Sequence, residues 1–291
     1  MKKYLPYLDI MIQYTCNLSC RGCITMTDYM RKGSVSIEEG KVWLEEWSQK
    51  LDIDTVCLFG GEPLMNKDIT SWIRQTRKYF PQSKIKIITN GTYLKNKNIL
   101  AELFAAGNIE YQVSLHWREG QRFDSVKTEL LRQMQKYESW TRVKSDRKEI
   151  LYAFTHGAVT VQLALFGEFV QSYQGHGTTM KPWASDDIVA SYSNCGSPRN
   201  PILYKNKIYK CGPIANLRDT LELHNLLDTP VWQEYLNYNG FNANDDLTEL
   251  VNNFDKPNAI CSMCSKNKID AEIDHYAPNN VMEKKEIIWQ N

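Results

Sequence analysis

The distribution of the eight cysteines is the feature that most constrains what this chain can form. Three of them, at positions 16, 20 and 23, lie within eight residues, and four, at positions 195, 211, 261 and 264, lie in the last third. The N-terminus does not resemble a signal peptide, because Asp9 and Gln13 interrupt its apolar residues. Clustered cysteines in an unsecreted chain indicate metal or redox chemistry rather than disulfides. Cys57, within an apolar run, is interpreted as a small buried hydrophobic residue.

Composition excludes several classes of protein. The 291 residues include 35 Lys and Arg against 34 Asp and Glu, so the formal net charge of +1 gives no argument for nucleic acid or an anionic membrane as partner. Hydrophobic residues make up 42% of the chain, enough for a substantial core. No apolar run reaches the roughly 18 residues of a membrane span. We therefore expect a cytoplasmic protein with one large domain, or one domain and a small appendage.

Strand-like and helix-like segments alternate in the first half of the chain. Six apolar segments are typical of strands: 8–14, 55–59, 85–88, 111–115, 150–154 and 159–165. Helical periodicity marks four others: 36–49, 69–76, 99–104 and 130–140. The alternation predicts a parallel sheet covered by helices, with strands buried on both faces and nearly continuous in hydrophobicity. The series has six predicted strands, and few helices are inserted between the later ones. This favours a partial (β/α)6 TIM-like barrel, an α/β fold, over a closed eight-stranded barrel.

The character of the sequence changes after about residue 180. Residues 186–198 are polar and indicate a loop, and residues 202–209 predict a tight hairpin that turns at Lys205-Asn206. Residues 231–238 predict a helix, and residues 252–258 a linker. We therefore expect a barrel over residues 1–180, a small subdomain over 181–270 and a tail over 271–291.

The first cysteine group has the spacing of an iron–sulfur site. Three thiolates in one short loop do not easily complete a tetrahedral zinc site, although a structural zinc loop with a further ligand is the alternative. They suit three irons of a [4Fe–4S] cube and leave the fourth iron open. Gly60-Gly61-Glu62-Pro63 ends the second predicted strand, where glycines allow a ligand to approach the backbone closely. Glu62 or the adjacent carbonyl groups are suited to bind an ammonium group.

The two motifs together resemble the radical SAM superfamily, in which a C-x3-C-x2-C loop precedes a GGEP segment. The resemblance implies that Cys16, Cys20 and Cys23 hold a [4Fe–4S] cluster whose open iron chelates S-adenosylmethionine (SAM). It also implies roles in SAM binding for the residues at the ends of the second, third and fourth predicted strands: Gly60, Gly61, Glu62, Pro63, Thr89, Asn90, Ser114 and His116. The sequence departs from the family at Gly22, where an aromatic residue that packs near the adenine is common.

The second cysteine group completes a four-ligand pattern. Cys195 and Cys211 bracket the predicted hairpin, and Cys261 and Cys264 form a C-x2-C pair. The pattern resembles the twitch subdomain, a short form of the SPASM domain that holds one auxiliary [4Fe–4S] cluster. A structural zinc site with four cysteine ligands satisfies the same spacing and is the alternative.

The resemblance also implies a reaction. An external one-electron donor such as flavodoxin or ferredoxin reduces the first cluster, which cleaves SAM to give a 5′-deoxyadenosyl radical. The overall plan is similar to that of the 2-deoxy-scyllo-inosamine dehydrogenase type, which implies a two-electron oxidation of a small polar molecule with the auxiliary cluster as electron acceptor. His116 is a candidate base and Arg118 a candidate anchor for an anion.

Three alternatives stay open at the level of sequence. The first is a peptide-modifying maturase, although the short segment before the cysteine loop leads us to expect no N-terminal leader-binding domain. The second is a redox-neutral radical reaction. The third is a non-catalytic iron–sulfur carrier or zinc protein, which would leave the GGEP segment and the barrel pattern unexplained.

Overall fold

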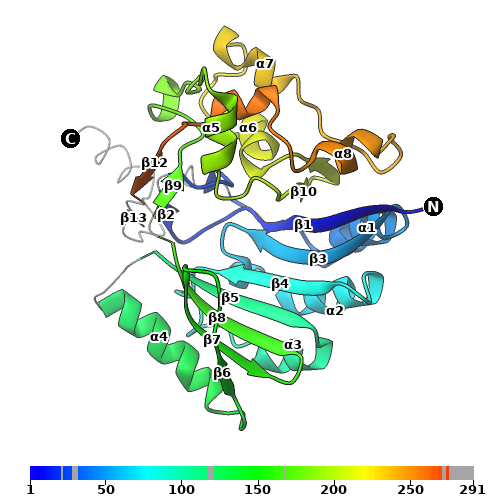
Figure 1. Ribbon diagram of the computed structural model, residues 1–291, viewed down its shortest axis with the longest axis vertical. Helices are drawn as coiled ribbons and strands as arrows, with labels where there is room; N and C mark the ends of the chain where they lie inside the picture. The colour runs from blue at the N-terminus through cyan, green and yellow to red at the C-terminus, as the bar shows by residue number, and fades with distance from the viewer. Residues whose placement is uncertain (21, 28–31, 117–120, 167, 271–272, 275–291) are drawn as a thin grey trace. The chain divides into compact units, whose positions relative to one another are not determined.

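The computed structural model describes all residues except 21, 28–31, 117–120, 167, 271–272 and 275–291 (Figure 1). The chain divides into two compact units. The first contains residues 1–13 and 34–167, and the second contains residues 14–33 and 168–291. The loop with the first three cysteines therefore belongs to the same unit as the last third of the chain. The boundaries expected at residues 180 and 270 stay predictions, and most of the expected tail lies outside the described residues.

A parallel sheet forms the centre of the first unit, with strands in the order β1-β3-β4-β5-β8-β7-β6. Its parallel part consists of β1 (Lys3–Gln13), β3 (Leu51–Gly60), β4 (Lys84–Thr89), β5 (Ile109–Leu115) and β8 (Val159–Leu165). The expected α/β class with a parallel-dominated, partly built barrel is confirmed, and the described strands do not close into a complete barrel.

The antiparallel edge of this sheet is a detail that the strand pattern did not predict. β7 (Ile150–His156) pairs antiparallel with β8, and β6 (Thr141–Val143) pairs antiparallel with β7. Only Gly157 and Ala158 separate β7 from β8. A connection this short permits a hairpin, whereas a parallel pair needs a crossover of a dozen or more residues. The parallel part therefore has five strands rather than six.

Three helices line one face of the sheet in Figure 1: α1 (Ile37–Ser48), α2 (Ile69–Tyr79) and α3 (Leu100–Ala106). Helix α1 begins as expected, because the Ser36 side chain accepts a hydrogen bond from Glu39 N. A Cβ on Gly40 would lie 2.2 Å from the Trp72 ring, so a glycine in α1 is what lets α2 pack this closely. Gly107, with φ +61°, ends α3 as predicted.

The fourth helix is shorter at its C-terminal end than the apolar spacing predicts. Helix α4 (Gln121–Met134) ends before Tyr137 and Trp140. Both aromatic rings pack against Phe104 instead, with ring centroids 4.6 and 5.8 Å away. Their place in the apolar pattern therefore reflects tertiary packing and not a continued helix.

The two faces of the parallel strands differ in polarity. Residues that share one face are apolar and buried across the sheet, for example Leu8, Val56 and Ile85 in neighbouring strands. The opposite face carries a polar row, in which Asp9 lies beside Cys57, Cys57 beside Lys86 and Lys86 beside Glu110. Lys86 Nζ and Glu110 Oε1 form an ion pair at 2.8 Å. The expectation of strands that are hydrophobic on both faces is therefore wrong in this row.

The second unit is built from short elements: β2 (Ser19–Cys20), β9 (Glu168–Val170), η3 (Gly177–Thr179), α5 (Ile188–Asn194), β10 (Ile202–Tyr204), β11 (Lys207–Tyr209), α6 (Gly212–Glu222), η4 (Pro230–Trp232), α7 (Gln233–Leu236), α8 (Thr248–Asn253), η5 (Ala259–Met263), β12 (Lys268–Asp270) and β13 (Ile273–Asp274). A buried apolar cluster forms its core and includes Met26, Leu217 and Trp232. The predicted hairpin is confirmed as β10 and β11, with positive φ at both Lys205 and Asn206.

Two segments of this unit were predicted wrongly. Helix α5 occupies part of the segment expected to be a loop, because the Asp187 carboxylate accepts a hydrogen bond from Ala190 N and starts a helix in polar sequence. Helix α8 extends to Asn253, inside the expected linker. In the described part of the chain, no helix is long and apolar enough to cross a membrane.

Gly60 provides a direct test of how the ends of β1 and β3 fit together. Its φ is +149°, and a Cβ there would lie 2.2 Å from the Gln13 carbonyl oxygen. We expect Gly60→Ala to lower the free energy of unfolding by more than about 3 kcal/mol, measured by urea denaturation. Gly157→Ala is the matched control, since Gly157 also has a positive φ but no heavy atom within 4 Å of its Cβ position, and it should cost about 1–2 kcal/mol. Equal losses in the two variants would contradict the close approach.

Candidate functional site

The first three cysteines lie on a compact loop in the second unit. The loop is closed at its base by a hydrogen bond from Tyr14 N to Gly33 O at 3.0 Å. Cys20 is in β2, which pairs antiparallel with β13 through Ile273, and Cys23 N donates to Cys20 O at 3.2 Å. Short-range backbone bonds therefore hold the cysteine backbones in one tight turn.

The sulfur atoms of this loop have hydrogen-bond partners suited to thiolates. Cys23 Sγ lies 3.3 Å from both Thr25 Oγ1 and Thr27 Oγ1, and both threonines are buried. Leu18 N donates to Cys16 Sγ at 3.4 Å. Donors aimed at sulfur stabilise the charged ligand form that an iron–sulfur cluster requires. The loop is therefore chemically suited to the cluster that the spacing predicts. The threonines were not singled out from the sequence, and no spacing rule identifies them.

Gly22 is explained by its backbone and its neighbours. Its φ is +75°, and a Cβ there would lie 3.3 Å from Phe169 Cβ and 3.5 Å from Val170 O. An aromatic side chain at position 22 would need both a strained backbone and displacement of β9. The departure from the family pattern at this position is therefore imposed by local packing.

The GGEP segment lies at the C-terminal end of β3 in the first unit. Gly61 N donates to Gln13 O at 2.7 Å, which joins the ends of β1 and β3. Pro63 begins the 3-10 helix η2 (Pro63–Met65), with Glu62 as its N-cap. The backbone carbonyl groups of this turn stay the predicted ligands of an ammonium group, although those of Glu62 and Pro63 each accept a hydrogen bond from Met65 N and Asn66 N, respectively, at 3.0 Å.

The Glu62 side chain is fully buried and is engaged by the protein itself. Its carboxylate oxygens accept hydrogen bonds from Leu64 N at 2.9 Å, Thr89 Oγ1 at 2.6 Å and Asn90 N at 2.8 Å. Burial raises the pKa of Glu62 to about 7, and these three donors oppose the rise. Glu62, Thr89 and Asn90, three of the predicted SAM-binding residues, are thus brought together and join the ends of β3 and β4.

The two candidates on the fourth predicted strand also have protein partners. Ser114 lies in β5, where its hydroxyl accepts a hydrogen bond from Gln112 Nε2 at 3.0 Å. His116 directly follows β5, with Nδ1 3.4 Å from Phe166 O. Burial lowers the pKa of His116 to about 4, so the imidazole is neutral at pH 7. Arg118 lies outside the described residues.

The four late cysteines lie at the ends of short helices in the second unit. Cys195 ends α5, Cys211 is the N-cap of α6, Cys261 is within η5 and Cys264 ends η5. The hairpin β10–β11 connects the first two, as the sequence predicts. Cys57, by contrast, is fully buried in β3 of the first unit, which confirms its interpretation as a buried small residue.

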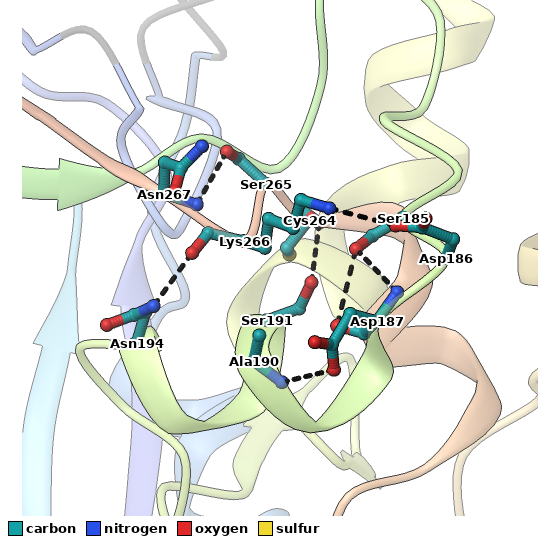
Figure 2. Close-up of polar contacts among 10 residues, drawn as sticks. All are labelled: Ser185, Asp186, Asp187, Ala190, Ser191, Asn194, Cys264, Ser265, Lys266 and Asn267. Atoms are coloured by element: carbon teal, nitrogen blue, oxygen red, sulfur yellow. Dashed lines mark hydrogen bonds and ion pairs between the residues drawn. The ribbon is translucent and has the colours of Figure 1, made fainter.

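Figure 2 shows the polar contacts that attach α5 to the segment around Cys264. Ser191 Oγ donates to Cys264 O at 3.1 Å, and Asn194 Nδ2 donates to Lys266 O at 2.7 Å. Because Cys195 directly follows α5, these bonds fix its position relative to Cys264. The helix that sequence analysis missed is therefore part of the framework of the second cysteine group.

Burial and the charges of neighbouring thiols act on three of the four late cysteines. Burial raises the pKa of Cys211 to about 12, and charges on Cys195 and Cys261 add to the rise. Burial likewise raises the pKa of Cys195 and Cys264, and Cys264 is influenced by the other three. Buried thiols that influence one another in this way become stable thiolates when a metal centre supplies positive charge.

One backbone amide faces a sulfur atom of this group, because Ser197 N donates to Cys195 Sγ at 3.4 Å. Among the described residues, no three or more His, Cys, Asp or Glu side chains are placed to hold a metal ion as they stand. Ligation by either cysteine group therefore stays a prediction that the chemistry of the donors supports.

These observations define an α/β protein with a parallel sheet and two cysteine groups. Residues 10–117 match a family model described as the Radical SAM superfamily. This match covers the segment that holds both motifs, and it is to the family that the two motifs resemble. Curated relatives include the GTP 3′,8-cyclase of Peptoclostridium acidaminophilum, 30% identical over 128 residues that cover 42% of this chain and 38% of the relative. That of Moorella thermoacetica is 32% identical over 95 residues, 32% of this chain and 29% of the relative.

The chain thus spans roughly a third of the length of these curated relatives. Among solved structures, BtrN in complex with AdoMet and 2-DOIA aligns with a TM-score of 0.48 and 17% identity, and covers 91% of this chain and 94% of BtrN. Streptococcus suis SuiB bound to S-adenosylmethionine aligns with a TM-score of 0.34 and 21% identity, over 39% of this chain and 25% of SuiB.

The buried Glu62 carboxyl predicts a specific pH dependence of stability. A folded-state pKa of about 7, above the unfolded value near 4.5, means that its contribution is full below pH 4.5 and is lost as the pH rises through 7. The difference in unfolding free energy between the native protein and Glu62→Gln should therefore fall by on the order of 3 kcal/mol across that range, measured by urea denaturation. A constant difference for Glu62→Gln across that range would contradict the assignment.

Proposed function

We propose that this protein is a radical SAM enzyme in which Cys16, Cys20 and Cys23 hold the [4Fe–4S] cluster that binds SAM. The observation that carries the proposal is the cysteine loop itself, in a chain whose residues 10–117 match the Radical SAM superfamily. Three sulfurs from one short loop leave one iron of a cube without a protein ligand. Hydroxyl groups of Thr25 and Thr27 close to Cys23 Sγ support the ligand role of that sulfur.

When bound, the cluster and SAM supply the chemistry: reduction of SAM by one electron gives methionine and a 5′-deoxyadenosyl radical, which abstracts a hydrogen atom from the substrate. The protein positions the reactants and excludes water. In the first unit, Glu62 fixes the ends of β3 and β4, so that the GGEP carbonyl groups and Asn90 are held at one edge of the sheet. Rigid placement of this edge is what a binding site for SAM requires.

We further propose that the four late cysteines hold an auxiliary [4Fe–4S] cluster in a twitch-type subdomain. Charges on Cys195, Cys211 and Cys261 raise the pKa of the buried Cys264 thiol further than burial alone, which supports a shared centre. When bound, such a cluster supplies an acceptor for the single electron that remains on the substrate after hydrogen abstraction. Two-electron oxidation of a small polar molecule, such as an alcohol to a ketone, is balanced by that electron and by one proton transferred to a base.

His116 is the candidate base that the described residues offer. Its ring is neutral at pH 7 and can accept a proton. A pKa of about 4 makes the ring a weaker base than an ordinary histidine, so a proton accepted there is passed on to a stronger base. The polar row on one face of the sheet, with the Lys86–Glu110 ion pair, supports a polar rather than an apolar substrate.

A redox-neutral reaction is the second candidate, because the curated relatives are named GTP 3′,8-cyclase and a cyclisation needs no net oxidant. The two candidates differ in whether product formation consumes an electron acceptor. Anaerobic screening for compounds that are consumed in step with 5′-deoxyadenosine formation identifies the substrate. The redox state of the product then decides between the candidates.

Iron content tests the assignment of the two cysteine groups. Anaerobically reconstituted protein should hold about eight irons, the content of two cubes. Changing Cys16, Cys20 and Cys23 together to Ala should leave about four, because the second group is intact. Iron is measured by colorimetric assay and zinc by mass spectrometry in the same samples. Stoichiometric zinc in the triple variant would show that the late cysteines form a zinc site instead.

SAM cleavage tests the activity itself. With dithionite and SAM, the native protein should release 5′-deoxyadenosine, quantified by liquid chromatography. Cys20→Ala should reduce the release at least a hundredfold, because the cube then lacks a protein ligand. Cys57→Ala is the matched control, since Cys57 is buried in the first unit and belongs to neither group, and it should keep activity. Undiminished cleavage by Cys20→Ala would refute the proposed SAM site.

A further inference from the structure

Lys210 is a buried cation in the second unit, directly before Cys211. Its side chain is only 5% exposed, although lysine is rarely buried without a compensating partner. Its Nζ donates hydrogen bonds to Asn253 O at 3.2 Å and Phe254 O at 2.6 Å, and lies 5.5 Å from the centre of the Tyr192 ring. The ammonium group is therefore fixed in one place by two carbonyl groups and an aromatic face.

Helix α8 explains part of this arrangement. Asn253 is its last residue and Phe254 its C-cap, so Lys210 donates to carbonyl groups at the C-terminus of the helix. A cation at this position is favourable, because the last carbonyl groups lack intrahelical donors and carry partial negative charge. A capping role accounts for the two hydrogen bonds. It does not account for the placement of the cation beside a group of thiols.

Lys210 lies beside two of the late cysteines. It directly precedes Cys211, the N-cap of α6, and its Nζ packs over the Tyr192 ring of α5, the helix that Cys195 ends. Lys268 also acts on Cys195, but its side chain is exposed, and solvent screens such charges strongly.

We propose that Lys210 is a positioning residue that sets the reduction potential of the four-cysteine centre, with its fixed ammonium group stabilising the reduced cluster. The inference rests on the proposed auxiliary cluster. Reduction of a [4Fe–4S] cluster by one electron adds one negative charge, and net charge near the cluster is one of the factors that set its potential. A buried cation at a fixed position interacts more strongly with that added charge than an exposed one does. Lys210 therefore makes the centre a better electron acceptor.

The test uses the full chain with Cys16, Cys20 and Cys23 changed to Ala, so that only the second centre holds iron. About four irons in this background establish that the auxiliary cluster exists, and their absence would count against the proposed function. The midpoint potential is then measured by redox titration monitored by electron paramagnetic resonance. The variants in this background are Lys210→Gln and Lys210→Met, which remove the charge, and Lys210→Arg, which keeps it.

We expect both neutral variants to shift the midpoint to more negative values, and Lys210→Arg to restore most of the shift. Lys268→Gln should give a smaller shift. Lys205→Gln should give none, because Lys205 lies on the hairpin turn and forms an ion pair with Asp219 of α6. An unchanged midpoint in an iron-replete neutral variant overturns the inference. Loss of iron from the neutral variants overturns it as well, because Lys210 is then needed for the centre to form, as a helix cap, and not to set its potential.

Discussion

A close approach between two backbone segments organises the second unit. A Cβ on Gly212 would lie 2.4 Å from the carbonyl oxygen of Ile24, so only glycine at the start of α6 allows this contact. Met26, two residues further on, is fully buried in the core of the same unit. Because Cys23 precedes Ile24 and Cys211 precedes Gly212, the contact holds the two cysteine groups in a fixed relation. Electron exchange between two centres requires such a relation.

Buried ionisable groups are the second constraint, and each unit balances its own with local hydrogen-bond partners. Glu62 is fully buried, and its carboxylate accepts hydrogen bonds from the strand end beside it. The ammonium group of Lys210 donates to carbonyl groups at the end of α8. Unpaired burial of either charge would be costly. Each case is a buried ionisable side chain that local hydrogen bonds hold in place.

The cysteine spacing and the GGEP segment predicted the family that residues 10–117 match, and the alternation of strand-like and helix-like segments predicted the fold class, because both are patterns of residues close together in sequence. Strand ends and the β10–β11 hairpin were also predicted, since apolar runs and turn residues are local signals. The antiparallel β7–β8 pair was not, although the two-residue connection at Gly157 and Ala158 carried the signal. The engagement of Glu62 by Thr89 could not be predicted, because it joins residues 27 positions apart. Lys210 was missed because nothing in the local sequence distinguishes a buried lysine from an exposed one.

The central claim is that the first cysteine loop holds a cluster with one iron open to SAM. Electron–nuclear double resonance on the reduced protein, with SAM carrying ¹⁵N in its amino group, measures this directly. The account predicts a ¹⁵N coupling to the cluster that persists when Cys261 and Cys264 are changed to Ala and disappears in Cys20→Ala. A reduced, iron-replete protein that binds SAM without any ¹⁵N coupling would contradict it.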